Sequence, residues 1–360
     1  MRITALETPG HTDDSLSYVW CDTDVSDDPV GVFTGDALFV GDVGRADFYP
    51  QRAREVAGLL RSTSRKLLEL GDHVVIYPAH GAGSVCGSGM ADREISTLGY
   101  ERRHNPRLQT DSRDAFIEAK LAEHHEIPPY FKHMEALNLS GPPALERPIN
   151  VPPLTSAAVK GAMHNAVVVD VRSASAFLGA HLPRSLSLPA GMIASYAGWL
   201  LNAEDELVLV ADDAEAATAA AVQLARIGFD RATGYLAPAL TAWAAMGEAF
   251  NTLPVVDTDE VRARVESSPE NWTLLDVRGD NEVSTSRIAG SQHVYLGDLQ
   301  ARQNELDPGR HYTVMCGSGA RATIGASVLL RAGFTDVDLF FGSIGAWKSA
   351  GLTTETASGR

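Results

Sequence analysis

The sequence has few cysteines, no long apolar run and no excess of positive charge. Its three cysteines, Cys21, Cys86 and Cys316, are odd in number and widely spaced, which argues against a disulfide framework and favours reduced thiols in the cytoplasm. No apolar run approaches the ~18 residues of a membrane span. No export signal is recognised, so no membrane association is expected. The formal net charge of −16 argues against nucleic acid as a partner.

What is present is the composition of a folded protein, with 44% hydrophobic and 21% charged residues in a chain of 360. This length suits two or three domains. The chain also contains an internal duplication. Val167–Arg172 is repeated as Thr273–Arg278, and Ala237–Trp243 is repeated as Gly342–Trp347. Each copy therefore spans about a hundred residues, a common domain size.

Short β-rich apolar runs alternate with helical patterns in both copies, which predicts a parallel sheet between helices and an α/β class. The predicted strands are residues 166–171, 207–210, 272–277 and 312–315, and the clearest helix is 321–332. Proline clusters predict linkers at 141–153 and 251–255.

Residues 1 to about 140 have a different pattern but are again predicted to be α/β. Strands are expected at 32–33, 37–40 and 74–77, and helices at 51–70 and 114–126.

The clearest candidate for chemistry is the segment Met315–Arg321, directly after a predicted strand and directly before a predicted helix. Its glycines allow backbone N–H groups to turn toward one point, where the helix N-terminus adds partial positive charge. Both features favour a thiolate on Cys316, and Arg321 adds a fixed positive charge. The segment predicts a nucleophilic thiol, with an inert buried thiol as the alternative.

This loop, with Asp276–Arg278 upstream, resembles the rhodanese family, whose loop pattern is Cys-x-x-Gly-x-Arg, over about residues 256–356. The resemblance implies that Cys316 takes sulfur from thiosulfate or a persulfide, carries it as a persulfide, and gives it to a thiol or cyanide. Arg321 is expected to act beside it. The expected lining residues are Gly317, Ser318, Gly319 and Ala320. Four residues separate Cys316 from Arg321, fewer than in related phosphatase loops, so the pocket suits sulfur better than phosphate.

The first copy has Ala-Asp-Asp-Ala-Glu-Ala at 211–216, where the second copy has its thiol loop. It lacks the thiol, the glycines and the arginine, and its acidic residues would repel an anionic donor. We expect a non-catalytic rhodanese-like domain that acts as a spacer or docking surface. His181 fits the family's structural histidine, and Arg287 stands where the family usually has that histidine in the second copy.

Glycine-rich turns beside the predicted N-terminal strands contain residues of the metal-ligand type, a common arrangement in metalloenzymes. These turns are 8–12, 34–39, 44–47 and 77–81. They resemble the metallo-β-lactamase superfamily, in particular its persulfide dioxygenase and glyoxalase II branch. The resemblance implies that His11, Asp36 and His80 are metal ligands, with Fe(II) as the metal and Zn as the alternative. Arg45 is a candidate for holding an anionic substrate, and an ion pair with Asp47 is its alternative role.

The family's His-x-His-x-Asp-His segment is not found, so only His11 and Asp36 match a 2-His-1-carboxylate iron site. We therefore expect a truncated form of a longer fusion, with an incomplete metal site and no dioxygenase activity. An uncovered sheet face would favour association. Cys86 is either close to the same pocket or a structural thiol.

The predicted domains are a partial metallo-β-lactamase-like αββα domain at 1–145, an inactive rhodanese-like domain at 150–250 and an active rhodanese domain at 256–358. This order resembles persulfide dioxygenase–rhodanese fusions of bacterial sulfide metabolism. The resemblance implies a sulfurtransferase that uses thiosulfate, glutathione persulfide and thiols. Alternatives are a glyoxalase II-type hydrolase with an accessory rhodanese and a non-enzymatic sulfur carrier. A homo-oligomer is left open.

Overall fold

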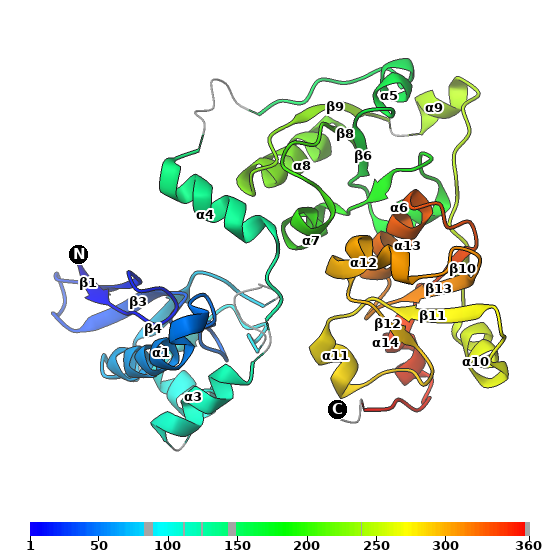
Figure 1. The fold of residues 1–360 in the computed structure, drawn as a ribbon. Coiled ribbons are helices and arrows are strands. Elements are labelled where there is room, and N and C mark those ends of the chain that lie inside the picture. Colours follow the sequence, from blue (N-terminus) through cyan, green and yellow to red (C-terminus); the bar gives the residue numbers. More distant parts are fainter. Residues whose placement is uncertain (83–88, 111, 124, 143–148, 239, 357–360) are drawn as a thin grey trace. The chain divides into compact units, whose positions relative to one another are not determined.

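The computed structural model describes residues 1–82, 89–110, 112–123, 125–142, 149–238 and 240–356. Cys86 lies outside these residues. The chain divides into two compact units, Met1–Glu126 and Ile127–Arg360 (Figure 1). In the described ranges, no helix has the length and apolar character needed to cross a membrane.

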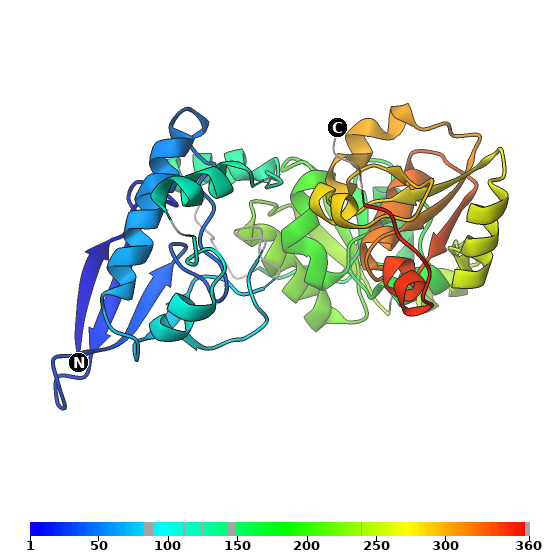
Figure 2. The same cartoon turned by 90° about the horizontal axis from the view of Figure 1, so that it is seen from below.

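The first unit is built on a five-stranded sheet of order β1-β2-β3-β4-β5, in which only the β3–β4 pair is parallel. Its strands are β1 (Arg2–Glu7), β2 (Leu16–Cys21), β3 (Pro29–Gly35), β4 (Val75–Pro78) and β5 (Ser96–Thr97). Its helices are η1 (Pro50–Arg52), α1 (Ala53–Leu68), α2 (Leu98–His104) and α3 (Arg113–Leu121). Figure 2 shows α1 running alongside the strands.

One face of this sheet is buried against α1. Val32 and Ile76 of the sheet pack in the same core cluster as Leu60 of α1, and all three are almost fully buried. Side chains on a strand alternate between faces, so Phe33 points the other way and remains 46% exposed. The sheet therefore has one covered face and one open face within this unit.

The strand predicted at 37–40 is wrong. These residues form a turn that makes only an isolated bridge between Leu38 and Val43. Gly41, with φ of 82°, reverses the chain, and Thr34 Oγ1 donates to the Leu38 carbonyl at 2.6 Å. The segment is apolar because it is buried in the core, and its local hydrogen bonds replace those of a ladder.

The second unit contains two parallel sheets, as the alternating pattern predicts. One has the order β7-β6-β8-β9 and the other β10-β14-β13-β11-β12. The strands are β6 (Val167–Asp170), β7 (Leu186–Ser187), β8 (Leu207–Val210), β9 (Ala232–Leu236), β10 (Val255–Val256), β11 (Trp272–Asp276), β12 (Gln292–His293), β13 (His311–Met315) and β14 (Val337–Phe340).

Helices connect these strands, and α4, which lies within the range expected for the first domain, clusters with the second unit. The helices are α4 (Tyr130–Ser140), α5 (Ser156–Ala162), α6 (Ala174–Gly179), η2 (Ala190–Met192), α7 (Ile193–Leu200), α8 (Ala214–Arg226), α9 (Thr241–Ala245), α10 (Thr258–Ser267), α11 (Asp280–Thr285), α12 (Leu296–Arg302), η3 (Gln303–Glu305), α13 (Ala320–Arg331) and α14 (Ser343–Ser349). Strand β8 is buried along its whole length, as expected for a parallel strand covered on both faces.

The two halves of the second unit share a hydrophobic core. Leu186 and Tyr196 of the first half belong to the same cluster of buried residues as Leu275 and Cys316 of the second. A buried hydrogen bond of 3.0 Å also joins the Ser187 N–H to Ser327 Oγ. The duplicated domains are therefore packed together and are not separated by an open linker.

Candidate active site

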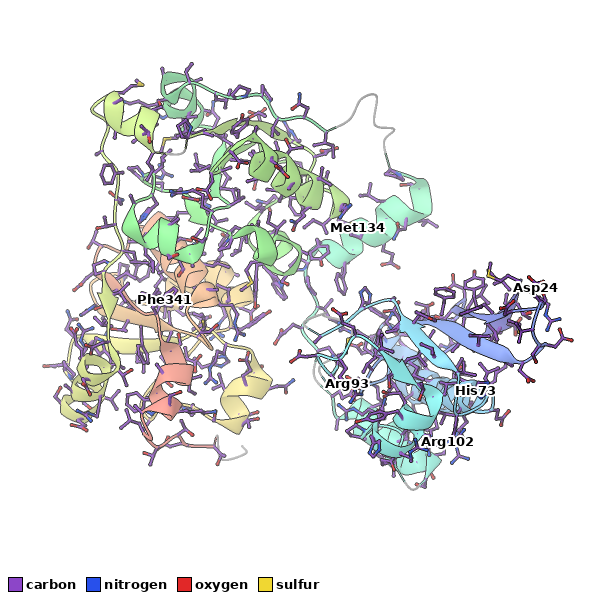
Figure 3. All side chains as sticks on the ribbon, turned by 180° about the vertical axis from the view of Figure 1, so that it is seen from behind. Asp24, His73, Arg93, Arg102, Met134 and Phe341 are labelled. Atoms are coloured by element: carbon purple, nitrogen blue, oxygen red, sulfur yellow. The ribbon has the colours of Figure 1, made fainter. Side chains whose placement is uncertain are left out.

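Cys316 lies in the turn between β13 and α13, as the sequence predicts, and its side chain is almost fully buried. Gly319 precedes the helix with φ of 97°. A Cβ on Gly319 would lie 2.6 Å from the Phe341 carbonyl oxygen, so only glycine fits this turn. Phe341 follows β14 and is labelled in Figure 3. The thiol is thus positioned at the N-terminus of a twelve-residue helix.

The sulfur atom is contacted by two polar groups of its own domain. The Gly319 N–H donates to Cys316 Sγ at 3.1 Å, and Ser343 Oγ lies 3.8 Å from the same sulfur. Ser343 Oγ also accepts the Cys316 N–H at 3.0 Å. Sequence reasoning identified 342–347 as part of the repeat but missed Ser343, since nothing in that pattern placed its hydroxyl beside the thiol.

Arg321 is close to the thiol, but its charge is shared with a carboxylate. Its guanidinium forms two hydrogen bonds with the Glu282 carboxylate of α11, at 2.5 and 2.8 Å. Burial opposes the charge of Arg321, yet Glu282 and the nearby Cys316 raise the pKa of the guanidinium, so it stays protonated. Glu282 was missed because it lies 39 residues away in the chain.

The corresponding loop of the first copy presents acidic side chains at the helix N-terminus. Asp213 accepts the Ala216 N–H at 2.8 Å and caps α8. A carboxylate therefore satisfies the helix dipole where the second copy has its thiol loop. Tyr196 of this first copy is buried in the same hydrophobic cluster as Cys316 of the second.

The duplicated Asp-x-Arg segments are buried ion pairs. Arg278 binds Asp276 with a shortest distance of 2.6 Å, and Arg172 binds Asp170 with the same shortest distance. Arg287 stands in the position of the family's histidine. Its backbone forms an isolated β-bridge with Glu355, and its guanidinium donates to the Ser291 carbonyl. These contacts connect segments within each copy and leave the thiol loop as the chemical site.

In the first unit, the three predicted metal ligands come together. Asp36 Oδ1 lies 3.2 Å from His80 Nε2 and 4.0 Å from His11 Nε2. His11 Nδ1 lies 3.1 Å from the Arg45 carbonyl oxygen, which orients its other nitrogen toward Asp36. Burial lowers the pKa of His11, although Asp36 opposes this, so the imidazole is neutral at pH 7.

These residues satisfy only part of what a metal requires. Asp36 Oδ1 is buried and has no hydrogen-bond partner in the described chain, as expected of an atom that could bind a cation. Imidazole and carboxylate are also donors that iron and zinc accept. Yet no group of three or more His, Cys, Asp or Glu residues among those described has an arrangement that would hold a metal ion. The three residues are therefore not a complete metal site.

A cavity of about 330 Å³ borders His80 and is also lined by Tyr77 and Arg93, the latter labelled in Figure 3.

Arg45 is fully buried, and its guanidinium binds both oxygens of Asp47 at 2.6 Å. Burial works to raise the pKa of Asp47, but these hydrogen bonds lower it overall. The structure thus shows the Asp47 ion pair, and a role of Arg45 in holding a substrate stays a prediction.

A thiol held between a parallel strand and a helix N-terminus defines a class of α/β domain suited to thiol-dependent group transfer. Comparison with known families identifies which one. The family model for the rhodanese-like domain matches residues 155–246 and 257–350, more than half of the chain. The chain therefore belongs to the rhodanese family.

Individual proteins support a fusion with a metallo-β-lactamase domain. A solved metallo-beta-lactamase from Staphylococcus aureus subsp. aureus COL is 31% identical, with a TM-score of 0.55 and coverage of 65% of each chain. Mouse persulfide dioxygenase ETHE1 is 35% identical over 127 residues, which are 34% of this chain and 42% of that protein. YtwF from Bacillus subtilis (strain 168), a proposed sulfurtransferase, is 30% identical over 93 residues, 26% of this chain and 88% of YtwF. The chain spans about two fifths of the length of the mycobacterial proteins it matches.

Proposed function

We propose that this protein is a sulfurtransferase that moves sulfane sulfur through a persulfide on Cys316. The observation that carries the proposal is the position of Sγ, which accepts the Gly319 N–H at 3.1 Å at the start of α13. Membership of the rhodanese family supports a role in sulfur metabolism. Thiosulfate, glutathione persulfide and other thiols are the proposed donors and acceptors.

The first half-reaction loads the sulfur. The Cys316 thiolate attacks the outer sulfur of thiosulfate, a bond forms between the two sulfurs, and the bond to the sulfonate sulfur breaks. Sulfite leaves with the electron pair of that broken bond, and the enzyme keeps a persulfide anion. Gly319 and the N-terminus of α13 stabilise negative charge on this group, because an N–H and a helix dipole point toward it.

The second half-reaction returns the enzyme to its starting state. The acceptor, a thiolate or cyanide, attacks the outer sulfur of the persulfide and breaks its bond to Cys316 Sγ. The product is a new persulfide or thiocyanate, and the Cys316 thiolate is restored. Arg321 lies close enough to contribute positive charge to an anionic substrate in both steps, while Glu282 holds the guanidinium in place.

A thiocyanate assay with thiosulfate and cyanide tests this function. We expect Cys316→Ser to abolish turnover and to prevent the mass increase of one sulfur atom seen after thiosulfate treatment. Cys21→Ser is the matched control, because Cys21 is also buried but lies on β2 of the other unit. Full activity of Cys316→Ser overturns the proposal. Loading of sulfur without steady-state turnover would favour the alternative of a sulfur carrier.

We further infer that His11, Asp36 and His80 contribute ligands to a metal in the first unit, by analogy with the metallo-β-lactamase fold. Fe(II) is the proposed metal, with Zn as the alternative. The Asp36 Oδ1 atom supports this inference, because it is buried and has no hydrogen-bond partner among the described residues. Because the described residues do not form a complete metal site, we derive no reaction step through a metal.

A further inference from the structure

Ser343 places its hydroxyl group beside the sulfur atom of Cys316. The side chain is fully buried, and its Oγ lies 3.8 Å from Cys316 Sγ. The same oxygen accepts the Cys316 N–H at 3.0 Å and lies 2.9 Å from the Phe340 carbonyl oxygen. One hydroxyl therefore contacts the backbone of the nucleophile, its sulfur atom and a carbonyl group of β14.

We propose that the Ser343 hydroxyl is a catalytic donor whose hydrogen bond follows the charge on Cys316 Sγ. It donates to the Phe340 carbonyl while this sulfur is uncharged, and it turns to Sγ when the sulfur is a thiolate. Its main effect is on the unloading step, in which Sγ is the leaving group. This inference rests on the proposed sulfur transfer and assigns a residue that assists the second half-reaction.

The hydrogen-bonding capacity of serine gives the hydroxyl a choice between two acceptors. A hydroxyl has one proton and two lone pairs, and the Cys316 N–H occupies one of the lone pairs. The proton can go to the Phe340 carbonyl or to Cys316 Sγ. An uncharged sulfur is a weak acceptor, so the carbonyl keeps the proton. A thiolate accepts a charge-assisted hydrogen bond, which is shorter and stronger, so we expect the hydroxyl to approach Sγ when the sulfur is charged.

The start of α14 fixes this oxygen relative to the thiol loop. The Ile344 N–H donates to the Cys316 carbonyl and the Gly345 N–H donates to the Gly317 carbonyl, both at 3.2 Å. With the bond from the Cys316 N–H to Ser343, two consecutive loop residues are tied to three consecutive residues of α14. A rotation of the hydroxyl proton can then change its acceptor while the backbone stays in place, as a preorganised donor requires.

The charge on Sγ disappears and returns during the proposed cycle. Loading forms the bond between Sγ and the outer sulfur, and the negative charge of the persulfide then lies on that outer sulfur. During unloading the acceptor attacks the outer sulfur, the bond to Sγ breaks, and its electron pair stays on Sγ. A hydroxyl that donates to Sγ at this moment stabilises the leaving thiolate, and a less basic thiolate leaves faster. The hydroxyl keeps its own proton throughout.

The same hydrogen bond has opposing effects on loading. It increases the fraction of thiolate, but it also lowers the nucleophilicity of that thiolate. At about pH 10, above the ordinary range of a thiol, the fraction of thiolate no longer limits the rate. Removal of the hydroxyl should therefore slow unloading, and it should leave loading at this pH close to the wild-type rate.

Single-turnover kinetics of the full chain test this role in Ser343→Ala, Ser343→Gly and Thr323→Val. Thr323 is the matched control, because its hydroxyl is also fully buried and bonds to the loop, donating to the Gly319 carbonyl at 3.0 Å. The persulfide is loaded with thiosulfate, and its unloading by cyanide is followed as thiocyanate.

Both Ser343 variants should unload more slowly than the wild type. Removing one preorganised donor typically lowers a rate by about 100-fold or more. Sulfur is a weaker acceptor than oxygen and the Gly319 N–H remains, so we expect a loss of about tenfold. Thr323→Val should unload at the wild-type rate, and all three variants should load at that rate at about pH 10.

The two Ser343 variants separate the chemistry of the hydroxyl from stability. Alanine keeps the left-handed backbone of residue 343 and glycine relieves its strain, whereas both lack the hydroxyl. Unchanged unloading, a defect limited to alanine, or an equal defect in Thr323→Val overturns this inference. Slower loading of the Ser343 variants at about pH 10 also overturns it, because the hydroxyl would then position Cys316 and not follow its charge.

Cys316→Ser, measured in parallel, separates this failure from failure of the proposed function. If Cys316→Ser forms no persulfide and both Ser343 variants unload normally, only the role of Ser343 is wrong. If Cys316→Ser still transfers sulfur, the sulfur-transfer mechanism itself is wrong.

Discussion

Ser343 binds the backbone of Cys316 from a left-handed conformation. Its Oγ accepts the Cys316 N–H at 3.0 Å and donates to the Phe340 carbonyl at 2.9 Å, while its own φ is 54°. A side chain in this region of φ costs about 1 kcal/mol or more. The hydrogen bonds of the hydroxyl therefore offset the energetic cost of a backbone conformation that glycine would adopt freely. They do so directly beside the nucleophile.

This relationship predicts that the two smallest substitutions differ in stability. Ser343→Ala keeps the strained backbone and leaves a buried N–H without its acceptor, so we expect a loss of about 1–3 kcal/mol in the free energy of unfolding. Ser343→Gly also loses the hydroxyl but relieves the strain, so its loss should be smaller. Denaturant unfolding of the three proteins gives the comparison. Equal stability of Ser343→Ala and the wild type would show that the hydroxyl does not support this turn.

The Arg321–Glu282 pair predicts the response to an anionic donor. Glu282→Gln should lower the KM for thiosulfate severalfold, because the guanidinium is then no longer neutralised by a carboxylate. Arg321→Ala should raise that KM by about tenfold, the effect of losing one charge-assisted contact. Steady-state kinetics over a range of thiosulfate concentrations test both variants, with Glu305→Gln, an exposed carboxylate paired to Arg302, as the control. A higher KM in Glu282→Gln contradicts the neutralising role.

The same pair predicts a dependence of stability on pH. Burial acts to raise the pKa of Glu282, but the hydrogen bonds from Arg321 lower it overall. A carboxyl group whose pKa is lower in the folded protein stabilises the fold above its unfolded pKa of about 4.3, and this contribution disappears as pH falls through the folded value. The wild type should therefore be more stable than Glu282→Gln at pH 7, and the difference should shrink below about pH 4. A difference that is constant with pH would assign the effect to packing.

The thiol site was predictable because its parts are adjacent in the sequence. Cys316, Gly319 and Arg321 lie in one strand–turn–helix segment, where apolar alternation and glycine placement give the geometry. Glu282 and Ser343 were not predictable, because each is brought to the thiol loop by tertiary packing of another helix.

In the N-terminal unit, the sequence brought the site residues together correctly but failed for one local element. His11, Asp36 and His80 were identified from three separate turns and do lie together. The segment 37–40 was wrongly predicted as a strand, because an apolar run of four residues has the same pattern in a buried turn as in a strand. Only Gly41, directly after this run, favours a turn over a strand in the sequence, and in the structure this glycine has a positive φ.

The cluster around Asp36 predicts metal binding that depends on this carboxylate. Titration of the metal-free protein with Fe(II) under anaerobic conditions, or with Zn(II), should give a measurable affinity in the wild type. Changes to residues outside the ligand set typically weaken metal affinity by roughly 10- to 100-fold. Asp36→Ala removes a direct ligand, so its metal affinity should fall by at least this factor. His104→Ala is the control, because His104 is exposed on α2 and contacts only Tyr100 among aromatic rings of the described residues. Equal affinity of the wild type and Asp36→Ala would exclude Asp36 as a ligand.

The open face of the N-terminal sheet predicts self-association. Tyr18, Phe33 and Tyr77 are paired across adjacent strands β2, β3 and β4, and each is 41–46% exposed. Phe33 and Tyr77 also contact each other, with ring centroids 5.1 Å apart. Such an aromatic row favours contact with a second copy of the chain, because association removes its apolar area from water.

Replacing Phe33 and Tyr77 together with threonine should weaken this association without loss of the strands, since threonine is also favoured in sheets. Sedimentation velocity over a range of protein concentrations measures the effect. Val25→Thr is the matched control, because Val25 is 83% exposed but lies in the turn after β2 and outside the aromatic row. If the wild type sediments as a monomer at every concentration, the row does not act as a contact between copies. If Val25→Thr has the same effect as the double variant, the association depends on general surface hydrophobicity and not on this face of the sheet.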